Sequence, residues 1–214
     1  MDLKQLAQKE AAAWEGSPYF TNAEKLTHIF WGERAIFVPL FRKLDLSRLV
    51  ELACGFGRHA EWVMQHYGTE VQAYVCMDVL EQNVTHTRQR LAPYGDKVKV
   101  LKGDGVSFQP VRTDAVTAVF CYDAMVHFDA RVVGAYLTDT FRILRPGGKA
   151  LYHHSNYDRA PGSVFSRNPH ARAHMSTNEF APLVQGAGLK ILEQVKIRWG
   201  NEADLDCVSL LEKS

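Results

Sequence analysis

The 214-residue sequence lacks an apolar run long enough to cross a bilayer, and no apolar stretch of signal-peptide length opens it. It is also poor in cysteine, and no Cys-x-x-Cys pair or zinc-finger spacing occurs. The four cysteines, far apart along the chain, are Cys54, Cys76, Cys121 and Cys207. We therefore expect reduced thiols in a cytoplasmic protein that has no membrane contact.

An excess of charge of either sign is missing as well. The formal net charge is +1, and 46% of the residues are hydrophobic, as in ordinary globular proteins. This balance argues against a protein that coats nucleic acid or acidic membranes. We expect a small-molecule substrate, no nucleic-acid partner, and a monomer or homodimer with one large core.

The first 46 residues are typical of helices. Residues 2–15 predict a helix that ends near Gly16, and Thr21 or Asn22 is a cap for a second helix running to about Lys43, which Pro39 kinks or ends. We interpret 1–46 as a helical extension or cap. Residues 47–214 then form the main domain, with a substrate-side insert near 155–176.

From residue 48 onward, strand-like and helix-like segments alternate. The expected strands are 48–53, 71–77, 98–102, 115–121, 149–154, 189–199 and 205–211, and the expected helices are 60–67, 80–91, 131–144 and 177–186. This alternation predicts a doubly wound α/β fold: a seven-stranded, mostly parallel sheet with helices on both faces. The short turn before the last strand predicts antiparallel pairing there.

Acidic and small residues follow the first three expected strands, where ligands of such sheets bind. Glu51 precedes Ala53, Gly55 and Gly57, small residues at alternate positions that let the backbone approach a ligand. Asp78 follows the second strand and suits two ribose hydroxyls. Asp104 follows the third strand, where a carboxylate suits an adenine amino group.

These residues resemble the first motifs of class I S-adenosylmethionine (SAM)-dependent methyltransferases, and the resemblance extends from about Leu49 to Ser214. It implies SAM as methyl donor and S-adenosylhomocysteine as product. Ala53 replaces the usual first glycine of the motif. The resemblance implies these cofactor-binding residues: Glu51, Ala53, Gly55 and Gly57 for the methionine part, Asp78 and Val79 for the ribose, Asp104 and Gly105 for the adenine, and Tyr122 at the methionine end.

Two other classes stay open. Gly55 to Ala60 also fits the dinucleotide fingerprint of NAD(P)-dependent oxidoreductases. Many short-chain members need a Tyr-x-x-x-Lys pair, and none of the eight tyrosines here has lysine four residues later. The second alternative is a SAM-binding module without catalysis.

Candidate bases for the methyl acceptor follow the fourth and fifth strands. An alcohol acceptor benefits from a general base, for which histidine is the usual choice. We predict catalytic roles for His127, His154 and Asp123. His153 and His154 point to opposite faces of their strand, so at most one of them faces the cleft.

The insert predicts substrate contacts. Between Arg159 and His174 it is basic and contains no acid, which favours either an anion-binding pocket or a solvated loop. We predict substrate-binding roles for Tyr19, Arg167, His170 and Arg172. His170 and His174 have the i, i+4 spacing of metal ligands on a helix, but no acid lies between them, and we predict no metal. Our hypothesis is O-methylation of a small polar acceptor, such as a sugar or phosphorylated sugar.

Overall fold

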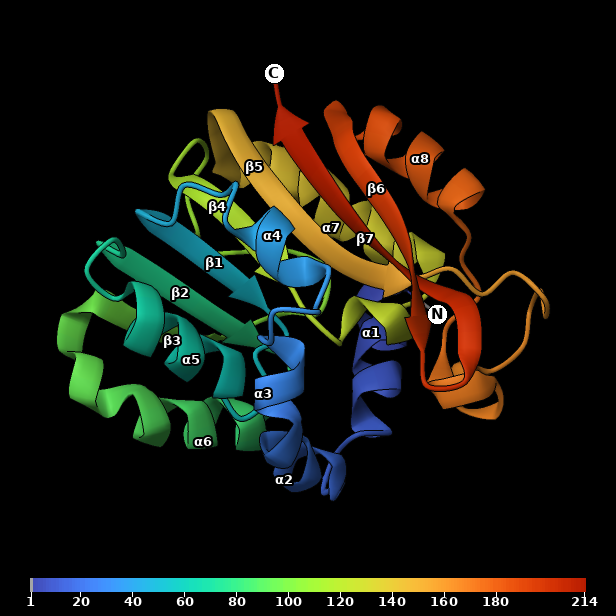
Figure 1. Cartoon of the computed structure of the whole chain (residues 1–214), viewed down its shortest axis with the longest axis horizontal. Helices are drawn as coiled ribbons and strands as arrows, with labels where there is room; N and C mark the ends of the chain where they lie inside the picture. The colour runs from blue at the N-terminus through green and yellow to red at the C-terminus, as the bar shows by residue number, and fades with distance from the viewer. Residues whose placement is uncertain (1) are drawn as a thin grey trace.

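The computed structural model describes residues 2–214, and within them seven strands form one sheet in the order β3-β2-β1-β4-β5-β7-β6 (Figure 1). Strands β1 to β5 are parallel, and β7 is antiparallel to both β5 and β6. The expected α/β fold is confirmed. The strands are β1 (Arg48–Leu52), β2 (Ala73–Asp78), β3 (Val98–Lys102), β4 (Val116–Cys121), β5 (Leu144–Ser155), β6 (Leu189–Trp199) and β7 (Glu202–Lys213).

Helices cover both faces of the sheet and enclose two hydrophobic cores. On one face lie α4 (Phe37–Phe41), α5 (Arg58–Tyr67) and α6 (Glu81–Leu91); on the other lie α7 (Ala130–Ile143) and α8 (Thr177–Gly186). Because β4 is buried on both sides, its side chains are apolar almost without interruption. Short 3₁₀ turns complete this part of the chain: η2 (Ala92–Lys97), η3 (Met125–His127), η4 (Phe165–Arg167) and η5 (Pro169–Ala171).

The N-terminal segment differs from the prediction. The first helix, α1 (Leu3–Ala12), is present, but the expected long helix to Lys43 was wrong. In its place the chain forms α2 (Tyr19–Ala23), η1 (Glu24–Leu26), α3 (Thr27–Phe30) and the separate α4. Trp31 ends α3 because its indole is buried, donates to His59 Nδ1 at 2.9 Å and stacks on Trp62. Tertiary packing here overrides local helix propensity.

One smaller expectation was also wrong, and one spacing does not correspond to a helix. The Pro146-Gly147-Gly148 segment, expected to precede the fifth strand, lies inside β5, which starts at Leu144. The i, i+4 spacing of His170 and His174 suits a helix, but His170 lies in a 3₁₀ turn and has a left-handed φ of 50°. His170 and His174 therefore do not share a helical face.

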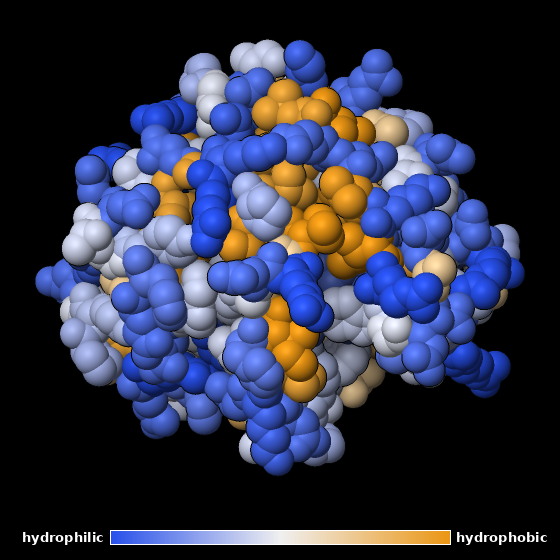
Figure 2. Space-filling model, viewed as in Figure 1, coloured by the Kyte–Doolittle hydropathy of each residue, from blue (hydrophilic) through white to orange (hydrophobic). Residues whose placement is uncertain are grey.

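Figure 2 shows apolar side chains gathered near the centre of the face seen in Figure 1, beside α4 and over β6 and β7. Partly buried hydrophobic residues of β6, among them Val195, Ile197 and Trp199, pack against the core here. The sheet is thus less completely covered at its antiparallel edge than beneath α5 and α6. No helix within residues 2–214 is long and apolar enough to span a membrane.

Candidate active site

A hollow lies beyond the carboxyl ends of β1, β2 and β4, where α/β sheets bind ligands. Its empty space, which includes the solvent at its open mouth, is about 830 Å³. The N-terminal helices close it on the outer side. Its lining includes four predicted cofactor residues (Ala53, Asp78, Val79 and Gly105) and three predicted acceptor-side residues (Tyr19, Asp123 and His127). It also includes Ala7, Glu10 and Ala11 of α1 and Trp14, which follows this helix.

The loop after β1 has the backbone that its small residues predict. Ala53, Gly55 and Gly57 have left-handed φ values of 56°, 56° and 79°. A Cβ added at Gly57 would lie 2.9 Å from the Thr87 side chain, so only glycine fits at this close approach. Gly55 and Gly57 allow the loop to turn but do not line the hollow, whereas Ala53 does.

Asp78 ends β2 at the floor of the hollow, and its carboxylate accepts three hydrogen bonds. Oδ2 accepts from Gly55 N at 2.9 Å, and Oδ1 accepts from Leu80 N and Asn83 Nδ2 at 2.9 and 3.1 Å. Burial raises the pKa of this carboxyl group. Because a carboxylate has about four acceptor positions, it can still accept a ligand hydroxyl.

Asn83 has an unpaired acceptor atom at the end of the hollow where Asp78 lies. Its side chain lines the hollow, and its buried Oδ1 has no hydrogen-bond partner. A buried acceptor without a donor is costly, and a hydroxyl beside Asp78 would satisfy it. The residues at this end of the hollow therefore fit the ribose of SAM.

The loop after β3 lies under the first helix. Gly105 lines the hollow, and a Cβ added to it would meet the Ala7 methyl group at 2.7 Å. Asp104 lies outside the lining: it accepts from Val106 N and Ser107 N and forms an ion pair with Lys4 at 3.0 Å. These contacts attach α1 to the loop predicted to hold the adenine.

Two predicted cofactor residues lie away from the hollow, on the side of the sheet that α4 and α5 cover. Glu51 is buried and accepts from Tyr74 Oη at 2.7 Å, and burial raises its pKa to about 8. Tyr122 stacks on Phe37 at 3.7 Å and donates to the Phe30 carbonyl. Side chains alternate along a strand, which directs both residues into this core.

At the opposite end of the hollow, three distant segments meet at Asp123. This residue follows β4 and has a left-handed φ of 61°. Its buried carboxylate accepts from Tyr19 Oη and from Arg58 Nη2, the latter at 3.2 Å. Burial raises the pKa of Asp123. Sequence reasoning missed Arg58, because only the fold brings the first residue of α5 to the end of β4.

His127 also lines this end. Its Nδ1 lies 2.7 Å from the Ala171 carbonyl, which only accepts, so Nδ1 carries the proton and Nε2 has a free lone pair. The ring packs against Trp14, at 4.5 Å between centroids. Burial, aided by the Arg172 charge, lowers the pKa of His127 to about 3, so the ring is neutral near pH 7.

The structure does not bring His154 to this end. Its ring is buried beneath α8, stacked on Phe180 at 3.7 Å, and its Nε2 lies 2.8 Å from Ser209 Oγ. Its neighbour His153 points the other way and accepts from Asp123 N at 3.2 Å. The alternation of the two histidines was predicted correctly, but the residue directed at the site is His153.

The basic residues of the insert do not converge on the hollow. Arg167 and His170 are exposed and outside the lining. Arg172 is buried in an ion pair with Asp206, and Arg159 pairs with Glu202 on the surface. No group of three or more His, Cys, Asp or Glu side chains within residues 2–214 is arranged to hold a metal ion.

Glu10 is a second residue that sequence reasoning missed. It lines the hollow from α1, and its Oε2 accepts from Asp129 N at 3.3 Å. Burial raises its pKa to about 7. The available signal was helical spacing, because Ala7, Glu10 and Ala11 share one face of α1.

Comparisons with known proteins agree with this geometry. Residues 49–148 match the family described as a methyltransferase domain. A comparison of the sequence with curated proteins found no match. Residues 49–148 are thus a methyltransferase domain, and the chain as a whole has the fold of class I SAM-dependent methyltransferases.

Solved structures share the fold at low sequence identity. A chain from the complex between a methyltransferase activator of Haloferax volcanii and a methyltransferase has a TM-score of 0.68 at 16% identity, covering 94% of this chain and 96% of that one. A SAM-dependent methyltransferase from Clostridium acetobutylicum has a TM-score of 0.64 at 12% identity, covering 82% and 89%. Geranyl diphosphate C-methyltransferase from Streptomyces coelicolor has a TM-score of 0.67 at 13% identity, covering 83% and 76%.

Proposed function

We propose that this methyltransferase acts on a hydroxyl group of a small, uncharged polar molecule such as a sugar. The observation that carries the proposal is the meeting of Tyr19, Asp123 and His127 at one end of the hollow whose other end fits the ribose of SAM. These side chains offer a carboxylate and a free imidazole nitrogen to a hydroxyl. Trp14 and Tyr19 add aromatic walls that suit a sugar ring.

When bound, SAM supplies a methyl group on a positively charged sulfur, which is a strong leaving group. The residues of the chain then have two tasks, to orient the acceptor and to take its proton. We assign orientation to His127, because its low pKa keeps the ring neutral, which leaves the Nε2 lone pair to accept a hydrogen bond but makes the ring a weak base. We assign the proton to the Asp123 carboxylate, because it lines the hollow and burial raises its pKa, which makes it a stronger base than an ordinary aspartate.

A neutral acceptor is favoured over a phosphorylated one. Glu10, Asp78 and Asp123 line the hollow, and the lining contains no lysine or arginine. A phosphate group among these carboxylates would be repelled. An amine acceptor is the second candidate, because carboxylates beside Trp14 and Tyr19 are also suited to bind a cation.

We also propose a role for the N-terminal residues and a location for the enzyme in the cell. Residues 1–46 act as a cap, since α1 and α2 complete the wall of the hollow. Arg90 attaches this cap to the loop after β1: it binds Glu24 at 2.7 Å and the Phe56 carbonyl at 3.2 Å. The enzyme acts in the cytoplasm, consistent with four buried, unpaired cysteines.

Calorimetric titration with SAM, S-adenosylhomocysteine, NAD and NADP is the first test. We expect only SAM and S-adenosylhomocysteine to bind. Binding of NAD or NADP would contradict the proposal. Product formation is then measured on matched panels of neutral sugars, their phosphates and small amines. Turnover of neutral sugars supports the proposal, preference for amines favours the second candidate, and SAM binding without turnover on any panel favours a non-catalytic module.

A further inference from the structure

A buried ion pair ties the insert to the last strand. Arg172 Nε and Nη2 donate to the two carboxylate oxygens of Asp206 at 2.7 and 2.6 Å, and Nη1 donates to the His170 carbonyl at 2.9 Å. Both side chains are almost completely enclosed, at 2% and 0% exposure. Every nitrogen of this guanidinium has a partner within the chain, and the enclosed side chain is not exposed to an external anion.

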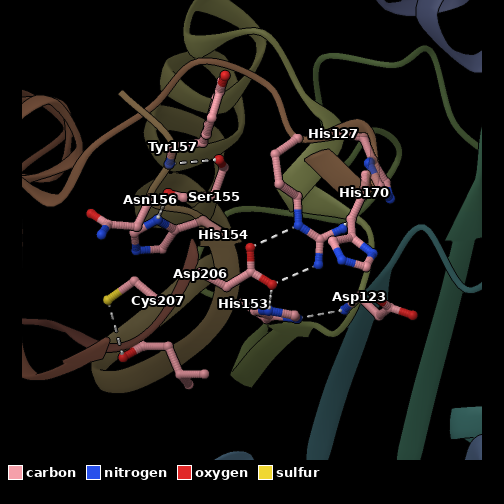
Figure 3. A network of polar contacts seen from close by, with 12 residues as sticks. Asp123, His127, His153, His154, Ser155, Asn156, Tyr157, His170, Asp206 and Cys207 are labelled. Carbon is pink, nitrogen blue, oxygen red and sulfur yellow. Dashed lines mark hydrogen bonds and ion pairs between the residues drawn. The ribbon is translucent and has the colours of Figure 1, made fainter. Parts of the chain in front are cut away.

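His153 continues the contact toward the hollow. Its Nε2 lies 3.0 Å from Asp206 Oδ2, and its Nδ1 lies 3.2 Å from Asp123 N (Figure 3). Burial would raise the pKa of Asp206, but hydrogen bonds from His153 and Arg172 outweigh that effect and hold the pKa at about 2. Asp206 is therefore an acceptor, which assigns the single ring proton to Nε2 and leaves the Nδ1 lone pair for the Asp123 N–H.

The Asp123 backbone needs such a partner. Its left-handed φ is unfavourable for a residue with a side chain, and such residues persist where the surroundings hold them. The His153 ring is the acceptor found for the Asp123 N–H within residues 2–214. The backbone at this residue in turn directs the carboxylate toward Tyr19 and Arg58.

We propose that Arg172, Asp206 and His153 are positioning residues, which fix the Asp123 backbone and so the carboxylate at the acceptor end of the hollow. None of the three lines the hollow, so they act through Asp123. The proposal rests on the proposed function in placing the acceptor beside Asp123. The proposal also gives the insert a role, because the Arg172–Asp206 pair couples the position of the insert to that of Asp123.

Two variants of His153 separate the two ends of this chain of hydrogen bonds. In His153→Asn the amide oxygen takes about the place of Nδ1 and can accept from Asp123 N, while the bond to Asp206 is lost. In His153→Gln the amide nitrogen takes about the place of Nε2 and can donate to Asp206, while the Asp123 N–H loses its acceptor. Both variants remove the same ring from the core, so each is the control for the other.

We expect His153→Gln to lower kcat/KM for the acceptor about 10- to 100-fold, mainly through kcat, and His153→Asn to lower it about threefold at most. The SAM dissociation constant should not change in either variant. Equal activities, or activities that only follow the melting temperatures of the two variants, would overturn the proposal.

Long-range ¹H–¹⁵N spectra of the full chain test the same contacts without an acceptor. We expect His153 to be protonated at Nε2 alone, and the Asp123 amide signal to shift in His153→Gln more than in His153→Asn. A proton on Nδ1 would overturn the proposal whatever the acceptor. If wild-type protein turns over no tested acceptor but these spectra are as expected, the proposed function fails and the positioning contacts stand.

Discussion

The two ends of the hollow are built in different ways. At the cofactor end, the chemistry lies in short segments directly after β1 and β2, where Ala53 and Asp78 are placed by their own strands. At the acceptor end, Asp123 meets Tyr19 from the cap, Arg58 from α5 and His153 from β5. The cofactor end is thus formed by residues close to one another in each strand and its following loop, whereas the acceptor end is assembled from four distant segments. Variants at the two ends should therefore separate cofactor binding from turnover.

The largest effect is expected from His127→Ala at the acceptor end. Loss of the imidazole that orients the acceptor should lower kcat/KM about 1,000-fold, while the SAM dissociation constant changes less than about threefold. Steady-state kinetics and calorimetry measure the two quantities. His66→Ala, which removes an exposed histidine, is the matched control. Unchanged turnover in His127→Ala would remove this residue from the mechanism.

Asp78→Ala should show the opposite pattern at the cofactor end. It removes the carboxylate predicted to bind the ribose and leaves the Gly55 and Leu80 amides without their acceptor. We expect the SAM dissociation constant to rise about 100-fold, equivalent to about 2.7 kcal/mol. Glu81→Ala removes an exposed carboxylate of α6 as control. Tight SAM binding by Asp78→Ala would contradict the assignment of this end.

Tyr19→Phe tests whether the cap takes part in turnover. The variant keeps the ring but removes the hydroxyl that donates to Asp123. We expect kcat/KM to fall about tenfold, equivalent to about 1.4 kcal/mol for one hydrogen bond to a charged group, with SAM affinity retained. Tyr157→Phe, in the insert, serves as control. A loss of SAM affinity equal to the loss of turnover would assign Tyr19 to the cofactor end.

Glu10→Gln should change how stability depends on pH. The Glu10 pKa rises from its ordinary value of 4.5 to about 7 in the folded protein, so folding takes up a proton between these pH values. This group's contribution to the free energy of unfolding is therefore full below about pH 4.5 and is lost as pH rises through 7. Because Glu10 is only partly buried, we expect Glu10→Gln to raise the free energy of unfolding at pH 8 by only about 1 kcal/mol, with no change at pH 4. Melting curves at the two pH values would contradict this if they shifted equally.

The smallest effect is expected from Arg167→Ala in the insert. Because this arginine is exposed and outside the lining, KM for the acceptor should change less than about twofold. Steady-state kinetics with a neutral and a phosphorylated acceptor measure it. A large rise in KM for the phosphorylated acceptor alone would revive the anion-binding interpretation of the insert.

The contrast between the two ends also explains what the sequence could predict. Strands such as β4 and the loop residues Gly55 and Gly57 have local signatures, in hydrophobic runs and in glycine, and their positions were predicted closely. The breaks in the N-terminal helices were not, because they depend on the burial of Trp31 against His59 and Trp62. Periodicity showed that His153 and His154 oppose each other, but it carried no information about which face Asp123 lies on.

Ala53 has a consequence for the stiffness of the cofactor end. Its φ of 56° is one that glycine adopts freely and alanine adopts at a cost of about 1 kcal/mol. The methyl group also removes many conformations that glycine would sample in the unfolded chain, which offsets part of that cost. In the folded protein the residue would relax toward negative φ if it were free, so neighbouring contacts, such as the hydrogen bond from Cys54 N to the Met77 carbonyl at 3.0 Å, must hold the loop after β1 in this conformation. The stiffness of the cofactor loop therefore depends on its surroundings and not on the preference of its own residue.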